Sequence, residues 1–155
     1  MANVPERDPG APAGQGANVE ALYQEIILAH YRAPRNRGEL PGATGSAHLS
    51  NPTCGDDVTV ATIVDAGVIR EARFTGDACS IAQASASMMT ELARGATIGA
   101  VRRTRAALER MLTREPVTRD ALGELIAFEG VARYPARINC VLMPWRALEG
   151  AMGDA

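Results

Sequence analysis

The sequence predicts an α+β fold in which a small antiparallel sheet packs against helices within a single domain. Two β-rich segments, 58–64 and 68–74, are joined by a short turn that contains Gly67, which is the pattern of a β-hairpin. Helical patterns fill the chain after residue 79, so the hairpin precedes most of the helices and does not alternate with them. The chain has 155 residues, of which 46% are hydrophobic, and this is the size of one domain with its own core.

The chain before the hairpin is predicted to hold a leader, one helix and a short strand. Residues 1–17 are rich in proline and glycine and lack the apolar run of a secretory signal, so we expect a disordered leader, with the folded domain over 18–155. Asn18 is the expected N-cap of a helix whose apolar residues recur at helical spacing, and Pro34 is expected to end it. A short strand is expected near 47–49.

Four further helices are predicted after the hairpin, from apolar residues that recur every three or four positions. The first covers 80–94 and is rich in small residues, and Gly95 is placed to end it. The second covers about 97–113, and the third begins at Thr118. The last begins at Pro135, because proline suits the first turn of a helix.

The composition excludes several classes of function. All 16 basic residues are arginine, and without lysine the chain cannot form a Schiff base with pyridoxal phosphate. The net charge of −2 and the 4% aromatic content are unlike those of a nucleic-acid-binding domain, so no nucleic-acid partner is expected. No segment has the roughly 20 apolar residues that a membrane-spanning helix needs, so no membrane partner is expected. Three cysteines are too few for a disulfide framework, and we expect reduced thiols in the cytoplasm.

Three cysteines and one aspartate are the candidate metal ligands. Cys54 and Asp56 lie in a turn segment directly before the hairpin, and Cys79 follows the hairpin at the start of a helix. The two strands of a hairpin leave and return at the same end, so these residues are expected to lie close together. A helix N-terminus stabilises a thiolate, and with Cys140 from the last helix the set of three thiolates and one carboxylate suits tetrahedral Zn²⁺.

The same cysteines allow a plainer interpretation. Free cysteines are often buried as small hydrophobic residues, and the chain has no Cys-x-x-Cys pair. The two histidines, His30 and His48, are far from every cysteine in the sequence, and we expect ordinary buried or surface histidines.

Arg137 is a candidate supporting residue because it precedes Cys140 by three positions on a predicted helix, so both lie on one face. A zinc site with three thiolates and one carboxylate is negatively charged. A neighbouring guanidinium offsets that charge and can bind an incoming anionic sulfur species. The alternative is an ordinary solvent-exposed arginine.

Four groups of motifs follow one another along about residues 20–150. They are Leu22-Tyr23 with Ile26, His30-Tyr31 and Pro34-Arg35-Asn36; Asn51-Pro52-Thr53-Cys54-Gly55-Asp56; Gly76-Asp77-Ala78-Cys79-Ser80-Ile81 with Ala84-Ser85-Ala86-Ser87-Met88-Met89-Thr90; and Tyr134-Pro135-Ala136-Arg137-Ile138-Asn139-Cys140 with Trp145 and Leu148. In this order they resemble the motifs of the U-type iron–sulfur cluster assembly family, and specifically of its SufU branch.

Two features favour the SufU branch over the IscU-type scaffold proteins. The scaffold proteins carry a histidine directly before the third cysteine, where this chain has Asn139. SufU-type chains also have an extra helical segment between the second and third cysteines. The long interval from Cys79 to Cys140, with its two predicted helices, fits that form.

The resemblance implies a SufE/IscU-like architecture and a function. It implies a zinc-dependent sulfurtransferase that accepts persulfide sulfur from a SufS-type cysteine desulfurase and serves a downstream iron–sulfur scaffold. It implies Cys54, Asp56, Cys79 and Cys140 as zinc ligands, Cys54 also as the persulfide acceptor, and Arg137 as a supporting catalytic residue. Transfer then requires Cys54 to leave the metal when the desulfurase docks. We expect a cytoplasmic protein that is a monomer on its own.

Two other functions are compatible with these residues. The first is a scaffold that assembles a transient iron–sulfur cluster on the same cysteines, which are natural cluster ligands. The second is a purely structural zinc module with no sulfur transfer. One departure from the family pattern is Pro144, which removes the amide that would bond the carbonyl of Cys140, so we expect a kink or break in the last helix.

Overall fold

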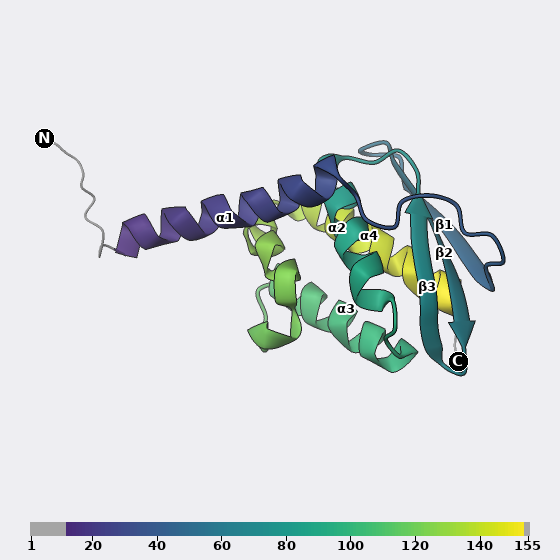
Figure 1. The fold of residues 1–155 in the computed structure, drawn as a ribbon. Helices are drawn as coiled ribbons and strands as arrows, with labels where there is room; N and C mark the ends of the chain where they lie inside the picture. Colours follow the sequence, from purple (N-terminus) through teal and green to yellow (C-terminus); the bar gives the residue numbers. More distant parts are fainter. Residues whose placement is uncertain (1–11, 154–155) are drawn as a thin grey trace, which may run out of the picture.

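The computed structural model describes residues 12–153, which form a three-stranded sheet and a group of helices (Figure 1). In chain order the elements are α1 (Pro12–Arg32), β1 (Gly45–Asn51), β2 (Asp56–Asp65), β3 (Val68–Thr75), α2 (Ser80–Ala93), α3 (Ile98–Leu112), the 3₁₀ helices η2 (Arg119–Ala121) and η3 (Gly123–Arg133), and α4 (Pro135–Met152). The predicted α+β class, with a small antiparallel sheet packed against helices in one domain, is confirmed. Among the described helices, none has the length and apolar character needed to cross a bilayer.

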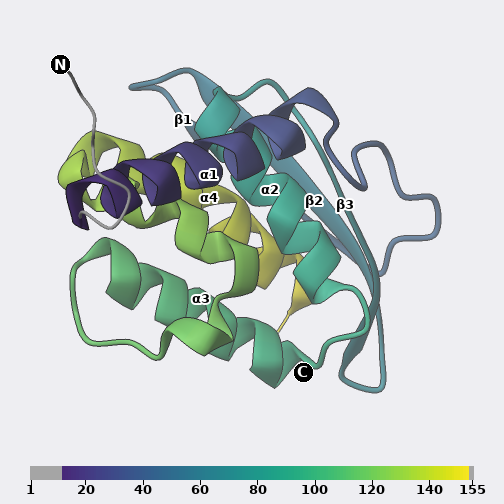
Figure 2. The same cartoon turned by 60° about the vertical axis from the view of Figure 1, so that its left-hand side comes forward.

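The sheet is an antiparallel meander in the order β1-β2-β3, and β2 is its central strand. Inward-facing residues of β2 are buried at every second position, as Val58, Val60 and Thr62 show. Both views place the helices on this face of the sheet, where α4 packs against β1 and β2, and α2 packs against β3 (Figures 1 and 2). The sheet therefore presents one face to the core.

The central core element is α4, which packs against the sheet and also against α2. Its buried side chains include Trp145 and Leu148. The break expected at Pro144 is absent, because α4 continues as one helix from Pro135 to Met152. A proline inside a helix costs about 3 kcal/mol or more, and the burial of this helix among β1, β2 and α2 offsets that cost.

The first helix begins earlier than the sequence predicted. It starts at Pro12, so Asn18 lies inside the helix and is not its N-cap. Proline suits a first helical turn, which is the physical reason for this start. The helix ends at Arg32, shortly before Pro34, as predicted. Residues 1–11 of the expected leader lie outside the described residues, and the domain boundary at residue 18 stays a prediction.

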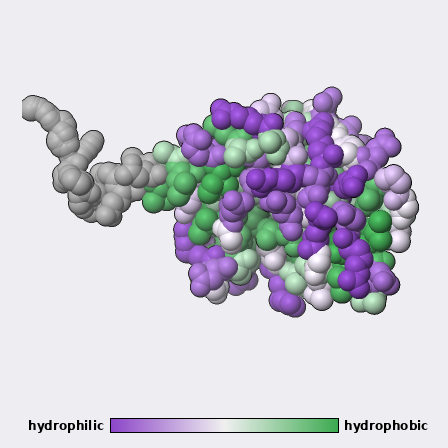
Figure 3. Space-filling view, viewed as in Figure 1, coloured by the Kyte–Doolittle hydropathy of each residue, from purple (hydrophilic) through white to green (hydrophobic). Residues whose placement is uncertain are grey.

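The outer part of α1 extends past the other elements in Figure 1. Hydrophobic residues gather there on the face seen in Figure 3, and Val19 and Leu22 are 44% and 57% exposed. The inner part of the same helix packs against α2 and η3. The anchored end of α1 is therefore the end that carries His30.

The helix predicted from Thr118 is not an α-helix. The chain forms two 3₁₀ helices, η2 and η3, on either side of Leu122. The large buried apolar residues of this stretch recur at every third position, at Leu122, Leu125, Phe128 and Val131, and the small Ala127 is buried between them. A 3₁₀ helix has three residues per turn, so this spacing lines them up on the side that faces the core.

This periodicity gives a test of the helix type. Replacing Leu125, which is fully buried, by alanine is expected to lower the free energy of unfolding by about 2–5 kcal/mol. The neighbouring Ile126→Ala variant is the control, because Ile126 is only partly buried, and it is expected to cost clearly less. Urea denaturation measures both values. Equal costs for the two variants would contradict the 3₁₀ register.

Candidate metal centre

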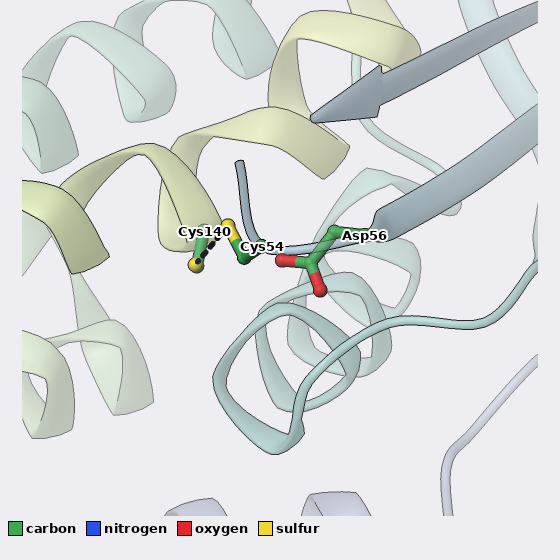
Figure 4. Close-up of side chains that lie close together, drawn as sticks. All are labelled: Cys54, Asp56 and Cys140. Carbon is green, nitrogen blue, oxygen red and sulfur yellow. Dashed lines mark hydrogen bonds between the residues drawn. The ribbon is translucent and has the colours of Figure 1, made fainter. Parts of the chain in front are cut away.

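Three predicted ligands from separate parts of the chain lie together at one end of the sheet (Figure 4). Cys54 comes from the turn between β1 and β2, Asp56 begins β2, and Cys140 lies in α4. Their ligand atoms all lie within 4.8 Å of one another. The Sγ atoms of Cys54 and Cys140 are 3.8 Å apart. Two sulfurs that each lie about 2.3 Å from a tetrahedral zinc ion are separated by about 3.8 Å, so this pair fits zinc.

The burial of Asp56 follows from the alternation of β2. Residues 56, 58, 60 and 62 point to the same face, and that face is the core, so Asp56 is only 2% exposed. A buried carboxylate is costly unless it is hydrogen-bonded. The backbone N–H of Cys79 donates to Oδ1 of Asp56 at 2.8 Å and supplies this bond.

Cys79 joins the group through Asp56. It is the N-cap of α2, and its thiol lies 3.5 Å from Oδ2 of Asp56. The sulfur of Cys79 also accepts a hydrogen bond from the N–H of Ala82 at 3.5 Å, inside the first turn of α2. The helix N-terminus therefore faces this sulfur, and the first free N–H groups of α2 point towards it.

Arg137 contacts the same sulfur. Its Nη2 donates to Sγ of Cys79 at 3.6 Å, and the side chain is exposed at the edge of the site. Burial opposes the charge on Arg137, but the neighbouring Cys79 and Cys140 outweigh this effect, so the pKa of the guanidinium is raised. The prediction that Arg137 lies at the cysteines agrees with this contact.

The thiol of Cys140 is strongly held in its protonated form when no metal is bound. Burial raises its pKa first, and the charge and hydrogen bond of Cys79 and the hydrogen bonds with Asp56 and Cys54 raise it further. A metal ion that binds Cys140 must therefore displace a proton. Three thiols and one carboxyl group meet here, and this donor set is one that a divalent cation such as Zn²⁺ binds once the thiols are deprotonated.

The histidines lie away from this group. His30 is buried, with Nδ1 bonded to Ser87 at 2.7 Å and Nε2 bonded to Glu124 at 2.9 Å. His48 is on the edge strand β1 and pairs with Asp57 at 2.7 Å. Both histidines have ordinary partners, as predicted.

A second cluster of possible ligands surrounds His30. Its Nε2 and carboxylate oxygens of Glu91 and Glu124 lie within 4.8 Å of one another. A cation of the chain already lies there, because Arg35 donates to Glu91 at 2.9 Å and approaches His30 to 3.4 Å. This cluster is therefore a side-chain network that joins α1, α2 and η3.

Sequence reasoning missed a groove that begins beside the site. It has a volume of about 1290 Å³ and is lined by residues of α1, η3 and the end of α3, with Ser80, Tyr134 and Arg137 at the cysteine end. No local sequence signal marks it, since its walls come from separate segments spread over residues 19–137. Arg137 is exposed where the groove begins.

Residues 22–141 match the family model described as the NifU-like N terminal domain. The chain belongs to this family. It is 38% identical over 134 residues to the "Zinc-dependent sulfurtransferase SufU" of Bacillus subtilis, which covers 86% of this chain and 90% of that protein. It is 35% identical over 141 residues to the "Iron-sulfur cluster assembly scaffold protein IscU" of Streptococcus pyogenes, which covers 88% of this chain and 86% of that protein.

Solved structures agree with this membership. FiSufU from Fervidobacterium islandicum, whose structure is described as that of an iron-sulfur cluster assembly scaffold protein for the SUF system, superposes with a TM-score of 0.81 at 30% identity, over 86% of this chain and 98% of that one. The N-terminal part of a NifU-like protein from Brucella abortus superposes with a TM-score of 0.76 at 29% identity, over 84% and 91%. The family resemblance inferred from the motifs, including its SufU branch, is confirmed.

The protonation of Cys140 predicts how metal binding depends on pH. Because the raised pKa keeps this thiol protonated in the metal-free protein, a Zn²⁺ ion that binds Cys140 must release its proton, and this proton alone is expected to raise the affinity by about tenfold per pH unit. Chelator competition at about pH 6 and pH 8 measures this change. An affinity that is equal at both values would exclude Cys140 as a ligand.

Proposed function

We propose that this chain is a zinc-dependent sulfurtransferase that accepts persulfide sulfur from a cysteine desulfurase for iron–sulfur cluster assembly. The observation that carries this proposal is the graded exposure of the three cysteines. Cys54 is exposed, Cys79 is partly buried and Cys140 is buried. A sulfur donor on another protein can reach only a thiol at the surface, so Cys54 is the acceptor.

The donor set supports zinc as the resident metal. Cys54, Asp56, Cys79 and Cys140 would hold it, and the sulfur separation of 3.8 Å between Cys54 and Cys140 fits one tetrahedral ion. Zinc supplies positive charge that keeps its thiol ligands deprotonated at neutral pH. The relative from B. subtilis is named as zinc-dependent, which supports the same choice.

Sulfur transfer at Cys54 is a thiol exchange. The Cys54 thiolate attacks the terminal sulfur of the desulfurase persulfide, the sulfur–sulfur bond of that persulfide breaks, and the desulfurase cysteine leaves as a thiolate. Cys54 then carries the persulfide, and no external oxidant or reductant is consumed. The new persulfide is passed to a downstream iron–sulfur scaffold.

Cys54 must leave the ligand set before it attacks, and its position on a turn permits this. The next residue, Gly55, has a φ of +74°, and a Cβ there would meet nothing within 4 Å. Asp56 and Cys140 are anchored in β2 and α4, so release of Cys54 does not disturb them.

Arg137 assists by charge. A persulfide anion that reaches Cys54 enters a site already crowded with anionic ligands. The exposed guanidinium of Arg137, 3.6 Å from Cys79 and at the mouth of the groove, offsets this repulsion and can bind the incoming sulfur. Its planar fork of donors distinguishes it from an ammonium group.

The second candidate is a scaffold that assembles a cluster on the same cysteines. The relative from S. pyogenes, named a scaffold, supports it. Against it stands Asn139, which cannot supply an imidazole ligand and instead has its amide oxygen 3.4 Å from Arg146. Metal analysis separates the two, since a transferase purifies with about one zinc per chain and a scaffold with a coloured iron–sulfur cluster.

The acceptor is identified by trapping sulfur. After zinc-loaded protein is mixed with the desulfurase and cysteine, mass spectrometry is expected to find the persulfide on Cys54 and not on Cys79 or Cys140. Desulfurase turnover is expected to rise when the wild-type chain is added and to stay at its basal rate with Cys54→Ser. Stimulation by Cys54→Ser, or a persulfide on another cysteine, would refute the proposed function.

The Arg137→Ala variant is expected to keep its zinc and to melt at the wild-type temperature. It is expected to lose about tenfold in its stimulation of the desulfurase, because a charge-assisted contact of about 1.4 kcal/mol is removed. Arg137→Lys is expected to restore only part of it. Arg70→Ala is the matched control, because Arg70 is exposed near the β2–β3 turn and pairs only loosely with Asp65, 4.0 Å away. Full stimulation by Arg137→Ala would make Arg137 an ordinary surface residue.

A further inference from the structure

The loop between β3 and α2 carries Cys79, and each of its three preceding carbonyls is hydrogen-bonded. The carbonyl of Gly76 accepts from Nη2 of Arg37 at 3.0 Å. The carbonyl of Asp77 accepts from the backbone N–H of Asp57 at 2.8 Å. The carbonyl of Ala78 accepts from Nε2 of Gln83 at 2.8 Å. Two of these three donors are side chains outside the ligand set.

The two side chains also hold each other. Nη1 of Arg37 donates to Oε1 of Gln83 at 2.7 Å, so one guanidinium spans Gly76 and Gln83. We call Arg37 and Gln83 together the clamp. Gln83 lies in the first turns of α2, and both side chains donate hydrogen bonds to carbonyls of the 76–79 loop. A planar guanidinium can serve both acceptors at once, whereas a lysine ammonium lacks the fork geometry.

Contacts with β3 hold Arg37 in position beside the loop. Its backbone lies in a bridge to β3, because the N–H of Gly38 donates to the carbonyl of Phe74 at 2.9 Å and the N–H of Phe74 donates to Asn36 at 3.1 Å. Its guanidinium carbon lies 5.7 Å from the centre of the Phe74 ring. Phe74 is buried, so the base of the clamp is part of the core.

The loop has little freedom on the side of β2. Gly76 has a φ of +130°, and a Cβ there would lie 2.0 Å from the carbonyl oxygen of Asp57. The loop thus lies between β2 on one side and the clamp on the other. At its end, Cys79 bonds Asp56 through both its N–H and its thiol. Any movement of the loop therefore moves Cys79 and breaks its two bonds to Asp56, which is another of the four proposed ligands.

We propose that Arg37 and Gln83 are positioning residues that fix the 76–79 loop and thereby hold Cys79 and Asp56 in place for the metal. This inference rests on the proposed function, since it concerns the same ligands. When the clamp residues are replaced, the carbonyls of Gly76 and Ala78 lose their hydrogen-bond donors. The loop is then less restrained, so Cys79 would be released more easily than the other ligands, Asp56 and Cys140, that lie in regular secondary structure. With the Cys79–Asp56 pair less restrained, the four residues would hold the metal less tightly.

The test measures zinc release from the loaded, full-length chain to an excess of a chromogenic chelator. Arg37→Met keeps the aliphatic stem over Phe74 but removes both donors, and it is expected to speed release about tenfold or more, as the loss of outer hydrogen bonds does at metal sites. Arg37→Lys is expected to fall between this variant and the wild type. Arg73→Met is the matched control, because Arg73 also donates to a loop carbonyl, that of Glu39 at 3.1 Å, but has no contact with the 76–79 loop in the described structure.

Two further measurements separate positioning from general stability. Gln83→Glu keeps the acceptor for Arg37 but loses the amide donor to Ala78, so it is expected to speed release without lowering the melting temperature, and it serves if Arg37→Met does not fold. Hydrogen exchange of the amides at 76–79 in the metal-free chain is expected to accelerate in both clamp variants and not in Arg73→Met.

The outcomes decide between the two proposals. Zinc release at the wild-type rate in both Arg37→Met and Gln83→Glu would overturn the clamp, and so would equal acceleration by Arg73→Met. Wild-type protein that takes up no zinc would instead overturn the proposed function. In that case the exchange of the 76–79 amides still shows whether Arg37 and Gln83 hold the loop.

Discussion

The hydrogen bond from the N–H of Cys79 to the carboxylate of Asp56 is the constraint on which the site depends. Strand alternation turns Asp56 towards the core, where an unpaired carboxylate is costly. The N-terminus of α2 supplies the missing donor at 2.8 Å. This one bond joins the start of the central strand to the start of a core helix, and it places Cys79 beside Asp56. The position of the β3–α2 loop is then set by the same pair.

The fourth proposed ligand, Cys140, comes from the element that organises the core. Because α4 packs on the sheet and on α2, its Cys140 sulfur is brought to 3.8 Å from that of Cys54. Pro144 leaves one helix carbonyl without its usual donor, yet the helix continues. Ser85 of α2 donates to the carbonyl of Val141 at 2.6 Å, which joins α2 and α4 one residue beyond the ligand. The contact between α2 and α4 therefore both stabilises the core and positions Cys140.

The site combines three fixed groups with one that can move. Asp56, Cys79 and Cys140 lie on β2, α2 and α4, whereas Cys54 lies on an exposed turn. The proposed sulfur transfer needs this division, because the acceptor must reach the sulfur donor while the other proposed ligands stay in place. The proposed clamp of Arg37 and Gln83 likewise holds the loop before Cys79 in place. Arg137 stands where the fixed part of the site opens into the groove.

Local sequence features determined the hairpin, the helix that begins at Ser80 and the helix that begins at Pro135, because turn residues, apolar periodicity and helix-end preferences act over a few residues. The four candidate ligands were also readable from the motifs. The three-residue spacing from Leu122 to Val131 was present in the sequence but resembled an α-helical pattern until packing against the core selected the 3₁₀ form. Only the tertiary structure decided that Asp56 is buried, that Cys54 is the exposed thiol and that Arg37 reaches Gln83. These properties arise from contacts between segments far apart in the chain, and no local preference encodes such contacts.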